Sequence, residues 1–166
     1  EPYLAKMLGD KPVTTYDPRN SAVVPDTQNR DYPLYDWMPR HQEVLNYHAK
    51  NKPNLVFIGD SITHGWDNQQ ALWQECFAPY DTINMGFGGD QIQHVLWRLR
   101  NGEVNGIHPR LAVLMIGTNN SGGDAYTAEQ IADGIVAICR SLRKRLPHTK
   151  ILLLAIFPRG EKPNPQ

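Results

Sequence analysis

One serine in this sequence stands where a hydroxyl group can act as a nucleophile. Ser61 follows a short apolar run and the pair Gly59-Asp60. A serine in a tight turn between a strand and a helix exposes its hydroxyl, and its own N–H can donate to the oxygen of an incoming carbonyl group. The position predicts acyl transfer with Ser61 as the nucleophile. A plain turn and helix cap is the alternative, because Gly, Asp and Ser are also the residue types that favour turns and helix caps.

Two further segments carry hydrogen-bond donors of the kind that a developing oxyanion needs. Gly88 and Gly89 stand in a glycine-rich stretch, and Asn119 follows a third apolar run. Glycine amides and the side-chain amide of an Asn can both donate to such an oxygen. A packing turn is the alternative for the glycines, and a turn role is the alternative for Asn119. One acyl-transfer site is favoured because three separate loops each supply an expected part of it.

A dinucleotide site is the other chemistry that the glycines suggest. The Gly-x-Gly-x-x-Gly fingerprint starting at Gly86 requires a glycine at position 91, where Gln91 stands. Asp90, at the expected start of a helix, would also repel a pyrophosphate. The sequence has neither a Cys-x-x-Cys nor a His-Glu-x-x-His motif. We therefore expect a site without cofactor or metal.

Hydrophobic periodicity predicts the elements that would bring these loops together. Short apolar runs, typical of strands buried on both faces, occupy residues 55–58, 82–85, 111–116 and 151–157. Apolar residues at three- and four-residue spacing predict helices over residues 40–50, 69–77, 90–100 and 128–146. Asp90 and Thr127 are the expected N-caps of the last two helices. This alternation predicts an α/β protein, a three-layer α/β/α sandwich around a parallel, flavodoxin-like sheet.

A proline-rich segment, residues 1–40, precedes this alternation. Its aromatic residues are too numerous for a free linker, and they include Tyr32, Tyr35 and Trp37. We therefore predict an N-terminal extension packed on one domain over residues 41–166. The chain begins with Glu1 rather than Met, which favours a removed leader and a secreted or periplasmic location over a cytoplasmic one.

The charge balance and the apolar runs exclude two classes of partner. Seventeen basic residues stand against 17 acidic ones, so the chain lacks the basic footprint that nucleic-acid or anionic-membrane binding requires. The longest apolar run, residues 151–157, is far shorter than the roughly 20 residues of a membrane-spanning helix. We expect neither nucleic acid as a partner nor a membrane span.

The three motifs together resemble the first three blocks of the GDSL/SGNH hydrolases. These blocks are Gly59-Asp60-Ser61, Gly86-Phe87-Gly88-Gly89-Asp90 and Gly117-Thr118-Asn119-Asn120. Residues 88–103 and 158–165 are especially similar to the catalytic subunits of platelet-activating-factor acetylhydrolases. The lead-in with Trp37, Arg40 and His41 looks more like bacterial GDSL acylhydrolases. The likeness covers residues 54–166.

The resemblance implies a serine esterase and gives roles to particular residues. Ser61 would be the nucleophile. Its amide, the amide of Gly89 and the side chain of Asn119 would form the oxyanion hole. We also expect Asp60, Trp66 and Gly88 at the substrate. The implied substrates are small acyl esters, acetyl esters above all, of a small-molecule or carbohydrate alcohol.

The family's last block, Asp-x-x-His, does not occur in this sequence. No Asp follows Asp133, and the only later histidine, His148, precedes the fourth strand and should lie at the rim opposite Ser61. We interpret the domain as truncated before its last strand and helix. The base and its orienting carboxylate would come from a C-terminal fragment or a second chain. Assembly of identical copies is also open, although it cannot create a residue that every copy lacks.

Two histidines near the motifs are expected to pack or to face substrate rather than to act as the base: His64, three residues past Ser61, and His94. Two other functions remain open. One is an inactive relative that retains a carbohydrate pocket, and without the Asp and His we expect the isolated chain itself to lack turnover. The other is a flavodoxin-like module that binds its ligand at the same crevice without covalent chemistry.

Overall fold

Four parallel strands form the centre of the fold, which a computed structural model describes for residues 19–28 and 35–158. The strands are β1 (Leu55–Gly59), β2 (Thr82–Gly86), β3 (Leu111–Met115) and β4 (Lys150–Leu153). Their spatial order is β2-β1-β3-β4, with every neighbouring pair parallel. The chain moves from β1 to one side and then crosses back to the other, so the carboxyl end of β1 lies at the switch point where open α/β sheets bind ligands.

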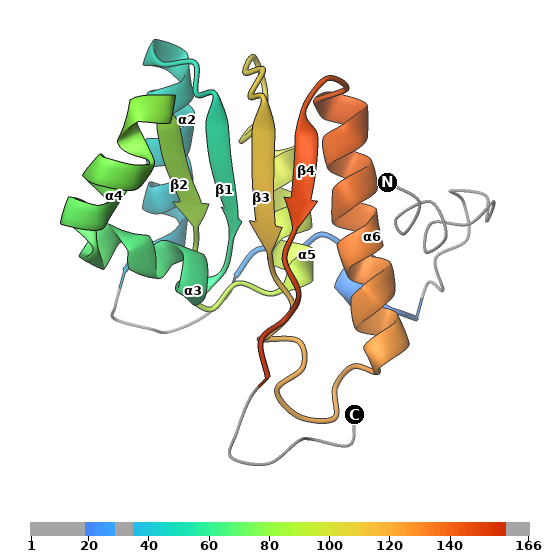
Figure 1. The fold of residues 1–166 in the computed structure, drawn as a ribbon. Helices are drawn as coiled ribbons and strands as arrows, with labels where there is room; N and C mark the ends of the chain where they lie inside the picture. The colour runs from blue at the N-terminus through green and yellow to red at the C-terminus, as the bar shows by residue number, and fades with distance from the viewer. Residues whose placement is uncertain (1–18, 29–34, 159–166) are drawn as a thin grey trace.

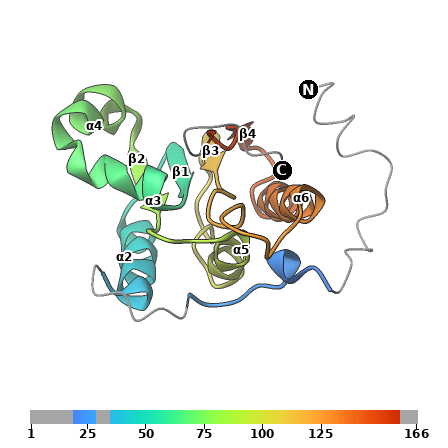
Figure 2. The ribbon, with the colours of Figure 1, turned by 90° about the horizontal axis from the view of Figure 1, so that it is seen from below.

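Helices cover both faces of this open sheet, which confirms the predicted α/β/α arrangement (Figure 1). The α-helices are α2 (Trp37–Lys50), α3 (Ser61–His64), α4 (Gln70–Cys76), α5 (Ile92–Arg100) and α6 (Ala128–Arg145). Three 3-10 turns, η1 (Ser21–Val23), η2 (Gly65–Asn68) and η3 (Ala78–Tyr80), complete the described elements. Figure 2 shows α2, α5 and α6 on one side of the sheet and α4 on the other.

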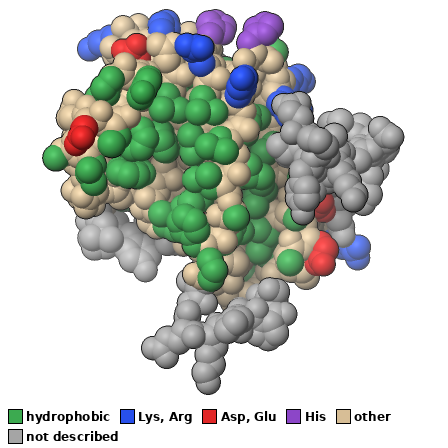
Figure 3. All heavy atoms as spheres, viewed as in Figure 1, with side chains coloured by type: hydrophobic (Ala, Val, Ile, Leu, Met, Phe, Trp, Pro, Cys, Tyr) green, Lys and Arg blue, Asp and Glu red, His purple; other side chains and the backbone are tan. Residues whose placement is uncertain are grey.

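The two faces of the sheet are covered unequally. Under α2, α5 and α6 lies the main core, in which Val56, Ile58 and Leu114 are fully buried. On the other face, α4 covers only the side of β1 and β2, and apolar side chains gather at the surface over the remaining strands (Figure 3). Leu152 of β4 is 48% exposed there. Among the described residues, no helix combines the length and the apolar composition needed to cross a bilayer.

The short helix α3 is seated directly on the carboxyl ends of β1 and β2 because both strands end in glycine. A Cβ atom on Gly86 would lie 2.2 Å from the backbone nitrogen of His64. A Cβ atom on Gly59 would lie 2.4 Å from the carbonyl oxygen of Met115 and 2.2 Å from the hydroxyl of Thr63. No side chain fits at such distances, so the close approach of the Ser61 turn to the sheet requires glycine at both strand ends.

Two helix starts and one strand end test the sequence-based boundaries. Thr127 and Gln130 form the predicted capping box at α6. Asp90, however, is wrong as the cap of α5: the helix is capped by Gln91, and Asp90 lies buried one residue earlier. The last strand also ends at Leu153 rather than at residue 157, although the N–H of Leu154 still donates to the carbonyl oxygen of Leu114 at 2.9 Å.

The described part of the N-terminal segment contacts the helices of the main core. The Asn20 side chain donates to the carbonyl oxygen of Gln130 at 3.1 Å. The backbone N–H of Asp26 donates to the carbonyl oxygen of Gln93 at 3.2 Å. Ala22 is fully buried. Residues 1–18 and 29–34, and with them Tyr32, lie outside the described residues, so a single packed extension over 1–40 stays a prediction.

We predict that Gly86→Ala destabilises the protein by about 1 to 3 kcal/mol, because its methyl group would force the backbone of α3 away from the sheet. Urea denaturation followed by tryptophan fluorescence measures this loss. Gly65→Ala is the matched control, since a Cβ atom there meets nothing within 4 Å. Equal stability of the two variants would show that α3 is not held against β2 as described.

Candidate active site

Ser61 begins α3 at the carboxyl end of β1, in the tight strand-to-helix turn that its neighbours predict. Asp60 caps the helix: its Oδ1 atom accepts a hydrogen bond from the N–H of Ile62 at 3.0 Å. Ser61 itself is exposed. Among the described residues, no group accepts a hydrogen bond from the Ser61 N–H, which therefore stays available at the start of the helix.

Asp60 is almost completely buried, although the sequence placed it at the substrate. Burial raises the pKa of its carboxyl group, and the hydrogen bond from Ile62 opposes this effect. Its Oδ2 atom has no hydrogen-bond partner among the described residues. In this geometry Asp60 holds the nucleophile turn from beneath, and a contact of Asp60 with substrate stays a prediction.

A cavity of about 870 Å³ brings the three predicted loops together. Ser61, Gly88, Gly89 and Asn119 all line it. They come from the ends of β1, β2 and β3, as expected if the carboxyl ends of neighbouring parallel strands share one edge. The segment before α2 supplies another part of the wall, with side chains that include Gln28, Tyr35 and Asp36.

Trp66 lies outside this lining. Its ring packs against those of Phe77 and Trp73, with centroids 5.1 and 6.3 Å apart, in an aromatic cluster beneath α4. Phe87 is fully buried under the Arg98 guanidinium group. The geometry therefore gives these rings packing partners, and a stacking role of Trp66 on substrate stays a prediction.

The glycine loop turns sharply at Gly89, whose φ angle is +75°. Side chains with a Cβ atom rarely adopt this conformation, which explains glycine at this position. The N–H of Asp90 closes the turn by donating to the carbonyl oxygen of Phe87 at 3.1 Å. Among the described residues, none accepts a hydrogen bond from the Gly89 N–H. A backbone donor thus stands at the cavity wall with its capacity unused.

Asn119 is fixed against the glycine loop. Its side-chain nitrogen donates to the carbonyl oxygen of Asp90 at 2.7 Å, and its own carbonyl oxygen accepts from Gln91 Nε2 at 3.0 Å. Because the amide nitrogen carries two hydrogens, one remains for an acceptor in the cavity. The next residue, Asn120, accepts from the N–H of Ile92 at 2.9 Å. The third loop is therefore joined to the second by side-chain bonds on both of its asparagines.

A buried network of charges anchors the same loop from below, and the sequence analysis did not find it. Arg98 Nε donates to Asp90 Oδ2 at 2.9 Å, and Arg98 Nη1 is paired with Glu103. Trp37 Nε1 donates to Asp90 Oδ1 at 2.7 Å, and His41 Nδ1 lies 2.8 Å from Glu103 Oε1. The available signal was an arginine between Val95 and Leu99 on the apolar face of α5.

The environment of Asp90 shifts its titration. Burial raises the pKa of its carboxyl group to about 7, and Arg98 and Trp37 act in the opposite direction. The Asp90 carboxylate, the guanidinium group and the indole N–H depend on one another, because removing any one of them leaves a buried polar group without a partner. Asp90 is therefore a structural acid of the loop rather than the helix cap that its position suggested.

His64 lines the cavity and holds the glycine loop. Its Nδ1 atom accepts from the Gly88 N–H at 3.0 Å, which leaves the proton of the neutral ring on Nε2, 3.4 Å from Asp67. Burial and then the charge of Arg40 lower the pKa of this ring. Because its acceptor nitrogen is occupied by a backbone donor, His64 lies at the cavity in a poor state to take a proton from Ser61.

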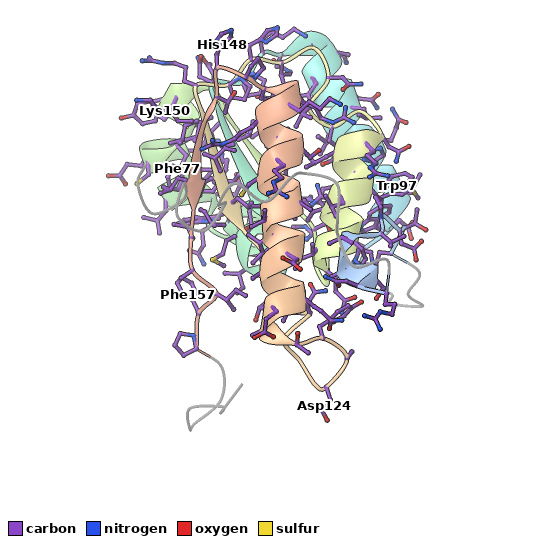
Figure 4. The ribbon with its side chains drawn as sticks, turned by 90° about the vertical axis from the view of Figure 1, so that its right-hand side faces the viewer. Phe77, Trp97, Asp124, His148, Lys150 and Phe157 are labelled. Carbon is purple, nitrogen blue, oxygen red and sulfur yellow. The ribbon has the colours of Figure 1, made fainter. Side chains whose placement is uncertain are left out.

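The other histidines are engaged or distant from the cavity. His94 Nδ1 accepts from the Gln91 N–H at 2.9 Å within the capping box of α5. His41 and His48 are buried in α2. His148 lies at the end of the sheet where β4 begins, and Phe157 at the opposite end, toward which all strands run (Figure 4). His148 thus lies at the rim away from Ser61, as its place in the sequence predicts.

Within residues 19–28 and 35–158, no cluster of His, Cys, Asp or Glu has the arrangement of a metal site. The described cavity instead collects the hydroxyl group of Ser61, the backbone amides of Ser61 and Gly89, which have no acceptors among the described residues, and the carboxamide of Asn119. This set can bind a carbonyl compound and stabilise negative charge on its oxygen.

Comparison with known proteins matches the same region of the chain. The sequence model of the GDSL-like lipase/acylhydrolase family matches residues 57–166. Platelet-activating factor acetylhydrolase IB subunit alpha1 of Bos taurus is 43% identical over 129 residues, which are 78% of this chain and 54% of that protein. Subunit alpha2 of Homo sapiens is 41% identical over 150 residues, which are 88% of this chain and 62% of that protein. The chain thus spans between one half and two thirds of the length of these relatives.

Solved structures agree with the fold. A predicted acylhydrolase from Bacteroides fragilis has a TM-score of 0.56 and 27% sequence identity, covering 75% of this chain and 60% of that one. A GDSL-like lipase from Bacteroides thetaiotaomicron has a TM-score of 0.53 and covers 68% of this chain and 56% of that one. At 21% identity, the second likeness concerns the fold alone.

We predict that the Asp90 carboxyl group titrates near pH 7, as measured by the ¹³C shift of its Cγ atom. The pKa of Asp90 in the folded protein lies above the ordinary value of 3.8. The contribution of this carboxyl group to the free energy of unfolding is therefore complete below pH 3.8 and is lost as the pH rises through about 7. Asp90→Asn, which cannot titrate, should lack this slope. A constant difference in unfolding free energy between the two proteins from pH 4 to 7.5 would contradict the assignment.

Proposed function

The chain belongs to the GDSL-like lipase/acylhydrolase family, and we propose that it carries the nucleophile and the oxyanion-binding groups of a serine esterase for small acyl esters. The observation that carries this proposal is the shared cavity of Ser61, Gly89 and Asn119. Three loops from three strands supply a hydroxyl group and two kinds of oxyanion donor to one volume. A binding site without covalent chemistry would not need this combination.

In the proposed reaction, Ser61 Oγ attacks the carbonyl carbon of the ester, and the carbonyl oxygen becomes an oxyanion. The N–H groups of Ser61 and Gly89 and the side-chain amide of Asn119 donate to this oxygen. The tetrahedral intermediate collapses to an acyl-serine and releases the alcohol, and water then hydrolyses the acyl-serine. These steps use protein groups and water, without a metal or an organic cofactor.

A proton acceptor for Ser61 is the remaining requirement. His64 is the histidine that lines the cavity, but its Nδ1 atom accepts from Gly88. We propose that the base and its orienting carboxylate belong to polypeptide outside these 166 residues, in a C-terminal segment or a second chain. Without a base, a serine hydrolase retains only about 10³- to 10⁴-fold catalysis over water.

Acetyl esters are the substrates that the relatives' names support, because these relatives are platelet-activating factor acetylhydrolase subunits. The alcohol of this protein's substrate is a separate matter. Asp36, Asp67 and Asn68 also line the cavity, and polar side chains of this kind suit an alcohol rich in hydroxyl groups, such as a sugar. A series of p-nitrophenyl esters of increasing acyl length, and acetylated sugars beside acetylated glycerol, would separate these possibilities.

We predict that Ser61→Ala abolishes both hydrolysis of p-nitrophenyl acetate and labelling by a fluorophosphonate probe, located by peptide mass. Ser141→Ala, on helix α6, is the control and should behave as the parent. Labelling that persists in Ser61→Ala would refute the role of Ser61. If the parent is not labelled even when purified as its longest natural polypeptide, the better interpretation is that the protein is an inactive relative of the family.

We predict that Asn119→Ala lowers kcat by about 10²- to 10³-fold and leaves KM within about twofold, because an oxyanion donor acts mainly in the transition state. Steady-state kinetics on the active protein measure both constants. Asn105→Ala removes an exposed carboxamide from another loop and serves as the control. A rise in KM at constant kcat would make Asn119 a ground-state binding residue instead.

A further inference from the structure

Gly88 is held at both of its peptide groups by side chains from other segments. Its N–H donates to His64 Nδ1 at 3.0 Å. Its carbonyl oxygen accepts two hydrogen bonds, from Tyr35 Oη at 2.6 Å and from Gln28 Nε2 at 3.1 Å. Tyr35 and Gln28 both belong to the segment that precedes α2, more than 50 residues earlier in the chain. Two distant side chains thus converge on one backbone oxygen beside the candidate nucleophile.

The carbonyl group of Gly88 and the N–H of Gly89 belong to the same planar trans peptide unit, so they point in opposite directions. Fixing the oxygen therefore fixes the direction of the N–H. We propose that Tyr35 and Gln28 are positioning residues that aim the Gly89 N–H at the substrate oxyanion. This inference rests on the proposed esterase function, in which Gly89 is one of the oxyanion donors.

The glycine loop needs such a restraint because its own backbone is permissive. Two consecutive glycines can rotate their shared peptide unit more freely than other residues can, and Gly89 already has a positive φ angle. An oxyanion donor contributes only when its direction is set before the charge develops. The clamp from Tyr35 and Gln28 removes this freedom by holding the carbonyl oxygen of Gly88.

The properties of the two donors suit a permanent clamp. Burial and then the charge of Asp90 raise the pKa of Tyr35 to about 12, so the hydroxyl stays protonated and remains a donor. Gln28 Nε2 also donates to Asp90 Oδ1 at 3.0 Å and thereby connects the clamp to the buried charge network. Donors on a peptide oxygen also polarise the unit, which strengthens the hydrogen bond that its N–H can make.

Steric contacts restrict the same loop. A Cβ atom on Gly88 would lie 3.1 Å from Tyr35 Cε1 and 3.5 Å from His64 Nδ1. The Tyr35 and His64 rings meet edge to face, with centroids 5.1 Å apart. Glycine at position 88 thus allows both side chains to approach the peptide unit. The two successive glycines are needed for different reasons: Gly88 for this close approach, and Gly89 for its positive φ angle.

Backbone dynamics test the clamp without requiring turnover. In ¹⁵N-labelled protein, the Gly89 amide should have an order parameter near 0.85, the value of a rigid backbone. Tyr35→Phe removes only one hydroxyl group, and the double variant Tyr35→Phe/Gln28→Ala removes both donors. We expect the order parameter of Gly89 to fall below about 0.6 in the double variant, with an intermediate value in the single one. Amides of β1 and α5 should keep their parental values.

Tyr80→Phe is the matched control, because it removes a tyrosine hydroxyl from an exposed ring in η3, which precedes the start of β2, whereas the glycine loop follows the end of that strand. Its Gly89 amide should be unchanged. If the clamp variants leave the shift and the order parameter of Gly89 at the parental values, the proposal is wrong. It is also wrong if the amides of the whole sheet change together, since the side chains would then support the fold in general.

Kinetics supply a second, separate measurement. On the active protein, the double variant should lower kcat by about 10- to 100-fold with KM nearly unchanged, because a misdirected donor weakens the transition state alone. If Ser61→Ala hydrolyses esters as fast as the parent, the esterase proposal fails, whereas the dynamics of Gly89 still decide whether the clamp exists. If Ser61 is required but kcat is parental in the double variant, the positioning role fails by itself.

Discussion

The buried guanidinium group of Arg98 is the interaction on which the candidate site depends. It lies between Asp90 and Glu103 and over the ring of Phe87, 3.9 Å from the ring centroid. A charge without water is costly unless it is paired, and a carboxylate beside it gains the same protection. The pair therefore fixes Asp90 at one place in the core. Because Asp90 directly follows Gly89, fixing it also fixes the end of the glycine loop.

From this anchor, hydrogen bonds extend to the third loop, to α2 and to the segment that precedes α2. The carbonyl oxygen of Asp90 holds the Asn119 side chain, and its carboxylate holds Trp37 and Gln28. The nucleophile turn is fixed differently, by close packing of α3 on the glycine ends of β1 and β2. Two kinds of restraint, a charged network and a steric fit, thus meet at one cavity. Both leave the N–H groups of Ser61 and Gly89 without protein acceptors among the described residues.

The proposed reaction divides into two tasks with different structural demands. Stabilising an oxyanion requires donors whose directions are set beforehand, because reorganisation during the reaction would cost the energy that the donors are meant to supply. The loops at the switch point of a parallel sheet meet this demand, since each begins at a rigid strand end. Proton transfer requires a base within hydrogen-bonding reach of the serine hydroxyl, which a separate segment can supply. This division is consistent with a chain that carries the first three family blocks and not the fourth.

The sequence by itself determined the sheet and the positions of the three motifs. Continuous apolar runs indicate parallel strands, and parallel strands place Ser61, Gly89 and Asn119 at one edge whatever the details of packing. It did not determine what surrounds them. It suggested Asp90 as a helix cap, because local pattern does not distinguish a buried side chain from one at the exposed start of a helix. Nor did it indicate that Tyr35 and Gln28 meet Gly88. Periodicity reports how a segment alternates between core and solvent, whereas hydrogen bonds between segments more than 50 residues apart arise only when the packed helices and strands fix distances and angles.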